Sequence, residues 1–215
     1  MFWDQFITTT FLTGLFASGI RLGTPLLLTA LGDTISQRAG VLNIGLEGLM
    51  IIGALAGFLG GYFAGTPWIG VLCAMLAGAL LSSIHGLLCT KLAADQIISG
   101  LALNVLGLGL AILVFRGVFG ITIIEEPQSP HFTLISIPLL SDIPFFGTVL
   151  FKQHIWVYIS WILVPLCYFI LFKTSWGLTV TAVGENPLAA DSAGINVQRT
   201  RFLAVVIGGA FAGLG

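Results

Sequence analysis

The sequence predicts an all-α protein, a polytopic transmembrane helical bundle, and three observations support this fold class. Of the 215 residues, 57% are hydrophobic and only 8% are charged, whereas soluble domains carry about 25% charged residues. The apolar runs are long and unbroken, unlike the roughly ten-residue segments of alternating polarity that form a membrane barrel. The chain also holds 28 glycines, many at spacings that let helices approach closely in lipid, such as Gly53, Gly57 and Gly61.

Polar and helix-breaking residues divide the chain into segments that suit membrane spans of about 20 residues. The predicted spans are residues 2–19, 22–36, 41–64, 68–90, 97–119 and 155–172. A seventh span begins near Phe202 and is cut off at Gly215. We therefore expect residues 1–215 to be a single transmembrane domain that is incomplete at its C-terminus.

Lysine and arginine placement predicts the orientation, because cytoplasmic loops carry an excess of these residues. A cytoplasmic N-terminus gives the inner side five basic residues, which are Arg38, Lys91, Lys173, Arg199 and Arg201. The outer side then receives three, which are Arg21, Arg116 and Lys152. The orientation depends most on the boundary at residues 19–21, because a kink there in place of a loop would change the number of spans by one.

The segment of residues 121–153 is extracytoplasmic in this orientation. It contains Pro127, Pro130, Pro138 and Pro144 among apolar residues. Loops this long rarely lack structure of their own. We expect short helices or turns there, at the outer membrane interface.

Three polar residues within the predicted spans are candidates for a solute pathway. Asn43 and Glu47 are four residues apart, which places them on one face of a helix, and Asn104 lies in the middle of its span. A charge at this depth costs about 2.5 to 3.5 kcal/mol on insertion scales, so such groups face the bundle interior or a pathway. The alternative for Glu47 is a hydrogen bond between helices, and Asn43 could be a helix N-cap.

The sequence lacks the motifs of the common enzyme and metal sites. His85 has no carboxylate or second histidine at metal-ligand spacing, which favours a packing role. No H-E-x-x-H, G-x-S-x-G or Walker A motif is present, so we expect neither an enzyme nor a bound metal or cofactor. The net charge of −1 provides no basic surface for nucleic acid.

The polar segment "VGENPLAADSAGINVQRTR" contains residues typical of the start and the end of a short helix. Asn186 followed by Pro187 is typical of a helix start, and Gly194 occupies the position where a left-handed residue ends a helix. Glu185 and Asp191 face water, while Leu188 and neighbouring small residues form a small apolar patch. A helix this short is unstable alone, so either its own membrane domain or a partner protein must support it.

Two motifs resemble a known family. "GENPLAADSAGINVQRTRFLAVVIGGAFAGLG" resembles the cytoplasmic loop and following span of ABC-importer permeases of the branched-chain amino acid, ribose and nucleoside superfamily. "LGDTISQRAGVLNIGLEGLMIIGALAG" resembles the early signature of the nucleoside and simple-sugar branch, S-x-R-A-G-V-x-N-I-G-x-E-G. The resemblance covers essentially the whole chain.

The resemblance implies a permease with a vitamin B12-importer-like fold in a bacterial cytoplasmic membrane. It implies that residues 174–201 form a cytoplasmic loop whose coupling helix, residues 185–194, contacts a separate ATP-binding subunit. The coupling residues would be Glu185, Asn186, Pro187, Leu188, Ala189, Asp191 and Gly194.

The implied partners are ATP-binding subunits, a second permease chain in a heterodimer, an extracytoplasmic solute-binding protein or lipoprotein, and the surrounding lipid. A nucleoside is the expected cargo, with riboflavin, a simple sugar or a branched-chain amino acid as alternatives. A secondary transporter or channel is the alternative from another class. It would require carboxylates at mid-depth around broken helices, and Glu47 is the one candidate for such a group.

Overall fold

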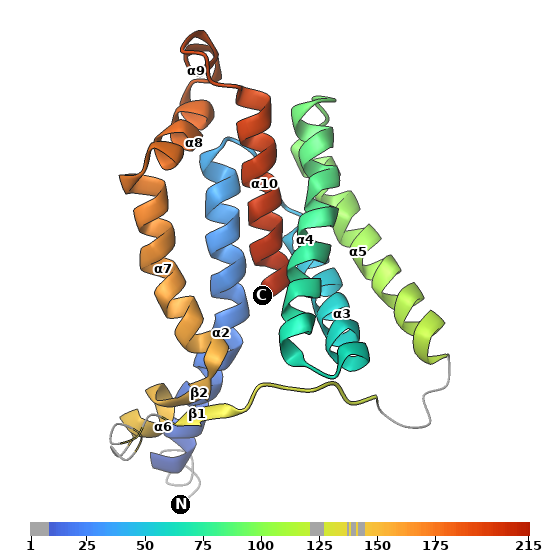
Figure 1. Cartoon of the computed structure of the whole chain (residues 1–215), viewed down its shortest axis with the longest axis vertical. Coiled ribbons are helices and arrows are strands. Elements are labelled where there is room, and N and C mark those ends of the chain that lie inside the picture. The colour runs from blue at the N-terminus through green and yellow to red at the C-terminus, as the bar shows by residue number, and fades with distance from the viewer. Residues whose placement is uncertain (1–8, 121–126, 137, 139–140, 142–144) are drawn as a thin grey trace, which may run out of the picture.

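The computed structural model describes residues 9–120, 127–136, 138, 141 and 145–215. Within this part of the chain, five helices are long and apolar enough to cross a membrane. They are α2 (Thr9–Arg38), α3 (Leu46–Ala64), α4 (Pro67–Thr90), α5 (Gln96–Phe119) and α7 (Ile155–Lys173). A further helix, α10 (Val197–Leu214), runs into the bundle beside α2 and α4 (Figure 1). The chain is a multi-pass membrane protein with a helical bundle.

The boundaries of most helices follow from residues visible in the sequence. Pro67 occupies the first turn of α4, where its missing N–H costs nothing. Asp95 caps α5 by accepting hydrogen bonds from the backbone N–H groups of Ile97 and Ile98, at 2.8 and 3.0 Å. The spans predicted at 68–90, 97–119 and 155–172 are therefore confirmed to within one residue at each end.

The predicted spans 2–19 and 22–36 are wrong as separate helices, because α2 continues through residues 19–21 without a loop. Arg21, which suggested the loop, lies on the helix and donates from Nε to Gln153 Oε1 at 2.9 Å. The side chain of Gln153 is fully buried, so the guanidinium of the exposed Arg21 has a partner at this end of the bundle without a loop.

The single helix changes the expected position of the start of α2. The first described residues of α2 lie at the end of the bundle opposite the segment that follows α7 (Figure 1). The described start of α2 therefore does not share a side with residues 174–201, as the predicted orientation required, and the N-terminus itself lies outside the described residues. The C-terminal ends of α2, α4 and α7 still lie together with the start of α10, so the five basic residues stay at one end.

Small residues allow α10 to pack closely against its neighbours. A Cβ at Gly209 would overlap the side chain of Ser82 on α4, and a Cβ at Gly53 of α3 would overlap the backbone of Gly213. Helices in lipid associate through such close backbone contact because lipid supplies no hydrophobic drive between them. The glycine spacing thus positions α10 at the centre of the described bundle.

The end of the bundle that contains residues 121–153 has structure of its own. Strands β1 (Leu134–Ser136) and β2 (Lys152–His154) pair antiparallel, with Ile135 opposite Gln153. Helix α6 (Phe146–Leu150) precedes β2. The short helix agrees with our expectation, whereas the strands were not predicted. Several prolines of this segment lie in described parts, but Pro144 and residues 121–126 lie outside the described residues.

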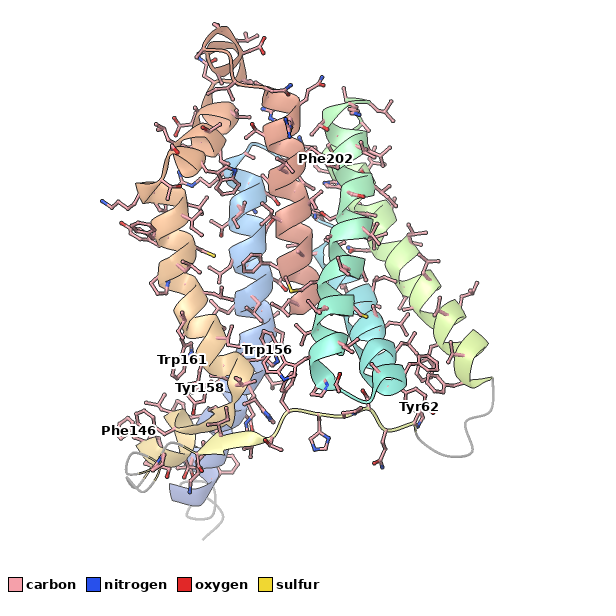
Figure 2. The ribbon with its side chains drawn as sticks, viewed as in Figure 1. Tyr62, Phe146, Trp156, Tyr158, Trp161 and Phe202 are labelled. Carbon is pink, nitrogen blue, oxygen red and sulfur yellow. The ribbon has the colours of Figure 1, made fainter. Side chains whose placement is uncertain are left out.

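Aromatic side chains gather at this same end (Figure 2). The rings of Trp68, Phe132 and Trp156 contact one another with centroids 5.0 to 6.3 Å apart. Figure 2 shows Tyr62, Trp156, Tyr158 and Trp161 at this level of the bundle. Tryptophan and tyrosine are typical of the membrane–water interface, so this end lies near one membrane surface.

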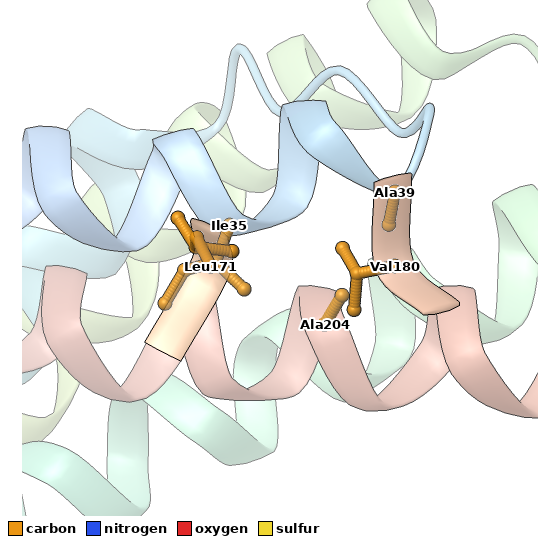
Figure 3. Packing of buried hydrophobic residues seen from close by; sticks show 5 residues of the cluster. All are labelled: Ile35, Ala39, Leu171, Val180 and Ala204. Carbon is orange, nitrogen blue, oxygen red and sulfur yellow. The ribbon is translucent and has the colours of Figure 1, made fainter. Parts of the chain in front are cut away.

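Two further helices lie at the opposite end of the bundle. Helix α8 (Ser175–Glu185) follows α7, and α9 (Pro187–Ser192) projects beyond it (Figure 1). A buried cluster fastens α8 to the bundle and comprises Ile35, Ala39, Leu171, Val180 and Ala204 (Figure 3). These residues come from the region of α2, from α7, from α8 and from α10, so α8 packs against three other helices of the bundle.

Candidate functional site

Helix α9 is capped at both ends by the residues that the sequence indicated. At its start, Asn186 Oδ1 accepts a hydrogen bond from the N–H of Ala189 at 3.0 Å, and Pro187 occupies the first position. At its end, Gly194 has a φ of +84°. The N–H of Gly194 donates to Asp191 O at 2.9 Å and that of Ile195 to Ala190 O at 3.0 Å. These two bonds form a Schellman motif, so the prediction of a short capped helix is confirmed.

The outer surface of α9 is polar except for one large apolar side chain. Glu185 and Asp191 are exposed, as predicted, and Asn186 is exposed as well. Leu188 is 82% exposed, the highest fraction among the exposed large hydrophobic residues of the described chain. Beside it lies a hollow of about 590 Å³, lined in part by Asp191, Ile195 and Gln198. An exposed leucine next to a hollow is suited to contact with a partner protein.

Ala190 is the buried residue of α9. It is 4% exposed, in contrast to its neighbours Ala189 and Asp191. One face of α9 therefore packs inward while Leu188 projects outward. This division gives a helix of six residues both internal support and a free apolar side chain.

The early motif, residues 31–57, does not form a continuous helix, because residues 39–45 separate α2 from α3. Irregular backbone at membrane depth must have its polar groups satisfied by protein or by a water-filled cavity. Here side chains from α4 and α5 satisfy them. Leu42 N–H donates to Gln96 Oε1 at 2.7 Å, and Leu42 O lies 3.2 Å from His85 Nε2.

Asn104 bonds to both the non-helical segment and the start of α3. Its Oδ1 accepts from the N–H of Gly48 at 2.8 Å, and its Nδ2 donates to Ile44 O at 3.1 Å. Both ends of the amide are therefore engaged with backbone. A Cβ at Gly48 would overlap the backbone of Leu103, so the close approach of α3 and α5 is what brings Asn104 within reach.

The expectation that Asn43 and Glu47 share a helix face is wrong, because α3 begins only at Leu46. Asn43 is 3% exposed and accepts from the N–H of Gly45 at 2.9 Å. It is not the N-cap of α3, a position that Gly45 occupies. Glu47 lies in the first turn of α3, where the helix dipole favours a negative charge, and its side chain is exposed.

His85 is buried and hydrogen-bonded, which agrees with the packing role expected from the sequence. It has no exposed surface, and its Nδ1 lies 2.9 Å from Ser99 Oγ. Its second contact, to Leu42 O, was not expected and joins α4 to the non-helical segment. Gln96 is not among the predicted site residues, because it falls between the predicted spans 68–90 and 97–119. The signal that could have revealed it is its place as the first residue of α5, facing that segment.

The three pathway candidates lie away from the cavity between the membrane helices. A cavity of about 430 Å³ lies among α2, α3, α4 and α10, and Arg21, Phe58, His154 and Trp156 are among its lining residues. Asn43, Glu47 and Asn104 are absent from that lining. They gather instead around the non-helical segment. In the part of the chain that the structure describes, no group of three His, Cys, Asp or Glu side chains is placed to bind a metal ion.

The comparisons with known proteins agree on a transport family. Residues 15–215 match the family model described as branched-chain amino acid transport system / permease component. The chain is 45% identical over 198 residues to the guanosine ABC transporter permease protein NupQ of Bacillus subtilis, covering 89% of this chain and 62% of that protein.

Two further relatives have similar coverage. The putative glucose ABC transporter permease protein TsgC13 of Haloferax volcanii is 39% identical, with 95% of this chain and 61% of that protein aligned. The nucleoside ABC transporter permease protein NupC of Lactococcus lactis is 35% identical, with 93% and 64% aligned. No solved structure matches the chain.

The chain thus spans about three fifths of the length of these relatives. The family match covers both the non-helical segment of residues 39–45 and α9. The chain belongs to the branched-chain amino acid transport system / permease component family.

Proposed function

We propose that this chain is part of the membrane permease of an ABC importer, in which α9 is the coupling helix. The single observation that carries the proposal is α9 itself, a capped helix that projects from the bundle with Leu188 82% exposed. A helix this short needs tertiary contacts to persist, and a rigid projecting helix is suited to transmit movement between two proteins. ATP would be bound by the partner subunit and not by this chain.

The proposed coupling surface consists of the seven residues named from the sequence. Leu188 would insert into an apolar cleft of the ATP-binding subunit, and Glu185 and Asp191 would lie at the polar rim. Asn186, Pro187 and Gly194 would maintain the geometry of the helix, and Ala189 would permit close approach. This division follows the usual anatomy of protein interfaces, in which a buried apolar anchor is surrounded by polar groups.

The proposed solute pathway passes the exposed side of the segment of residues 39–45 and the start of α3. Leu42, Ile44 and Glu47 are exposed there, and a carboxylate facing lipid would be costly. We infer that Glu47 faces a path formed with a second permease chain. Asn43 and Asn104 would then act behind this surface by holding the backbone in place, and the pair of permeases would be a heterodimer.

The orientation proposed for the complex places α9 in the cytoplasm of a bacterial cell, next to the inner membrane. Five lysine or arginine residues at or near that end of the bundle support it. Residues 121–153 would then be extracytoplasmic and would receive solute from a binding protein or lipoprotein. Described residues at the start of α2 would lie on this same outer side.

A nucleoside is the proposed cargo. Two of the relatives described above are named as guanosine or nucleoside permeases. A sugar is the second candidate, favoured by the relative named as a putative glucose permease at 39% identity. We therefore propose import of a small polar solute that carries a ribose or hexose ring.

Uptake by cells tests this proposal directly. Cells that lack their own nucleoside importers would express the full-length permease with its ATP-binding and solute-binding partners, and would be offered labelled guanosine or glucose. Energy-dependent guanosine accumulation that unlabelled nucleosides suppress, and glucose does not, is the expected result. Glucose accumulation would replace the nucleoside assignment by the sugar one, and uptake of neither would reject both.

A further inference from the structure

Arg201 bridges two helix ends that lie far apart in the sequence. Its Nε donates to Ala39 O at 3.1 Å, and its Nη2 donates to Val183 O at 3.3 Å. Ala39 and Val183 are both completely buried. The guanidinium, which starts from the first turns of α10, thus connects the end of α2 with the end of α8.

Both carbonyl groups lie at helix ends, where backbone carbonyls lack hydrogen-bond donors from their own helix. The last carbonyls of a helix have no intrahelical donor, and the negative end of the helix dipole favours a cation there. Val183 lies in the last turn of α8, and Ala39 directly follows the last residue of α2. Within the described residues, no carboxylate forms an ion pair with Arg201, and its side chain donates its hydrogen bonds to these two carbonyls.

The helix ends are also in close backbone contact. Gly40 has a φ of +80°, and a Cβ there would lie 3.2 Å from Gly184 Cα and 3.2 Å from Arg201 Nη2. A Cβ at Gly184 would overlap Arg38 O. The buried cluster around Val180 and Ala39 reinforces the contact (Figure 3). Residues 38–40, the end of α8 and Arg201 therefore behave as one packed unit.

This unit lies between the two candidate sites. On one side, Asn186 alone separates α8 from α9. On the other side, Ala39 and Gly40 are the first residues of the non-helical segment, whose Leu42 and Ile44 are hydrogen-bonded to His85, Gln96 and Asn104. A displacement of α9 that moves the end of α8 would therefore reach residues 41–45 through the Arg201 bridge.

We propose that Arg201 is a positioning residue that transmits the movement of α9 to the non-helical segment of residues 39–45. The proposal rests on the proposed function, because it requires α9 to be moved by an ATP-binding partner. It extends that function by naming the connection between the partner surface and the exposed segment near Glu47. Arg201 touches neither solute nor ATP in this scheme.

The test uses the purified, full-length complex and three variants. Arg201→Gln removes the charge and the planar guanidinium that donates to both carbonyls. Arg201→Lys keeps the charge, but its ammonium group can donate with good geometry to only one of the two carbonyls. Arg199→Gln is the matched control, because Arg199 is exposed and its side chain has no hydrogen bond in the described structure. Each complex is assayed for retained ATP-binding subunit, for basal ATP hydrolysis, and for its stimulation by the solute-loaded binding protein.

The proposal expects a specific pattern of losses. Arg201→Gln retains the ATP-binding subunit and basal hydrolysis, but the stimulation of hydrolysis by the solute-loaded binding protein falls by about tenfold, within the usual range of coupling between sites. Arg201→Lys is intermediate, and Arg199→Gln equals the wild type. Wild-type stimulation in Arg201→Gln overturns the proposal. So does loss of the ATP-binding subunit from both Arg201 variants, since Arg201 would then support folding alone.

Two outcomes separate this inference from the proposed function. If the Arg201→Gln protein alone is not produced in cells, the Arg201→Lys complex provides the test. Reduced stimulation of ATP hydrolysis with full retention of the ATP-binding subunit supports the bridge, and wild-type stimulation overturns it. If the wild-type complex itself retains no ATP-binding subunit, the proposed function fails first. If the binding protein stimulates ATP hydrolysis equally in the wild-type complex and in the Arg201 variants, the bridge is rejected and the proposed function stands.

Discussion

Gly194 determines the end of α9 through its backbone and not through packing. Its φ of +84° lies in the left-handed region, and a Cβ at this position would meet no atom within 4 Å. A side chain there would strain the backbone by about 1 to 2 kcal/mol without creating a clash. The two C-terminal hydrogen bonds of α9 depend on this conformation.

Replacing Gly194 with valine should therefore weaken capture of the ATP-binding subunit and abolish uptake, while the membrane helices still insert. Gly194→Asn is the matched control, because asparagine tolerates the left-handed region. Affinity capture of the permease followed by quantification of the ATP-binding subunit checks both variants. Equal capture and normal uptake in Gly194→Val would contradict the role given to α9.

Leu188 is the proposed apolar anchor, and its truncation should reduce capture of the ATP-binding subunit without lowering permease abundance. An anchor of this kind contributes more than about 2 kcal/mol to an interface, which corresponds to a loss of roughly thirtyfold in affinity. Ser192→Ala, at an exposed position of the same helix, serves as control. The same capture assay applies, and full retention in Leu188→Ala would remove Leu188 from the interface.

Asn104 should stabilise the permease, because its amide satisfies two backbone groups of the early motif. Asn104→Leu leaves both unpaired, at a cost of about 1 to 3 kcal/mol each. Asn104→Asp can still accept from Gly48 but cannot donate to Ile44, so its loss should be smaller. Thermal unfolding of the detergent-solubilised protein would rank wild type, aspartate and leucine in that order, and an unchanged leucine variant would contradict the assignment.

At the scale of elements, the position of α10 depends on glycines that let its backbone approach α4 closely. Gly209→Ala places a methyl group into the side chain of Ser82, and overpacking of this kind costs about 1 to 3 kcal/mol. Gly109→Ala on α5 is the matched control, because a Cβ there meets nothing within 4 Å. The expected result is a lower unfolding temperature for the first variant and no decrease for the second.

The length of helices was predictable where apolar runs were interrupted by recognisable caps. Asp95 and Pro67 marked true boundaries, and Asn186 and Gly194 marked α9. Arg21 misled the prediction, since a charge within an apolar run indicates a loop only if it has no partner. Its partner, Gln153, is 132 residues away in sequence, and hydropathy alone does not reveal such a contact.

The non-helical segment of residues 39–45 could not be predicted from local sequence for the same reason. Its backbone is satisfied by Gln96, His85 and Asn104, which belong to two other helices. The motif itself reads as a continuous apolar run with a few polar residues. Asn104 was correctly singled out by its depth, but its role as a backbone ligand, and the contact between His85 and Leu42, required the packed bundle.

At the scale of the whole molecule, α2 as one helix places its described N-terminal end on the side opposite α9 (Figure 1). Single cysteines at Ser192 and at His131, in a background without the three native cysteines, should therefore react from opposite sides of the membrane. A membrane-impermeant maleimide applied to intact cells should label the His131→Cys variant and spare Ser192→Cys. The reverse pattern would invert the proposed orientation, and labelling of both would contradict the topology.

The central claim is that this membrane domain moves solute only when an ATP-binding subunit acts on α9. The most direct measurement is uptake of labelled guanosine into proteoliposomes that contain the full-length complex, with and without ATP on the side of α9. ATP-dependent accumulation in the wild type, lost in Leu188→Ala, is the result that the account predicts. Guanosine accumulation that needs no ATP, or that proceeds equally in Leu188→Ala, would contradict it.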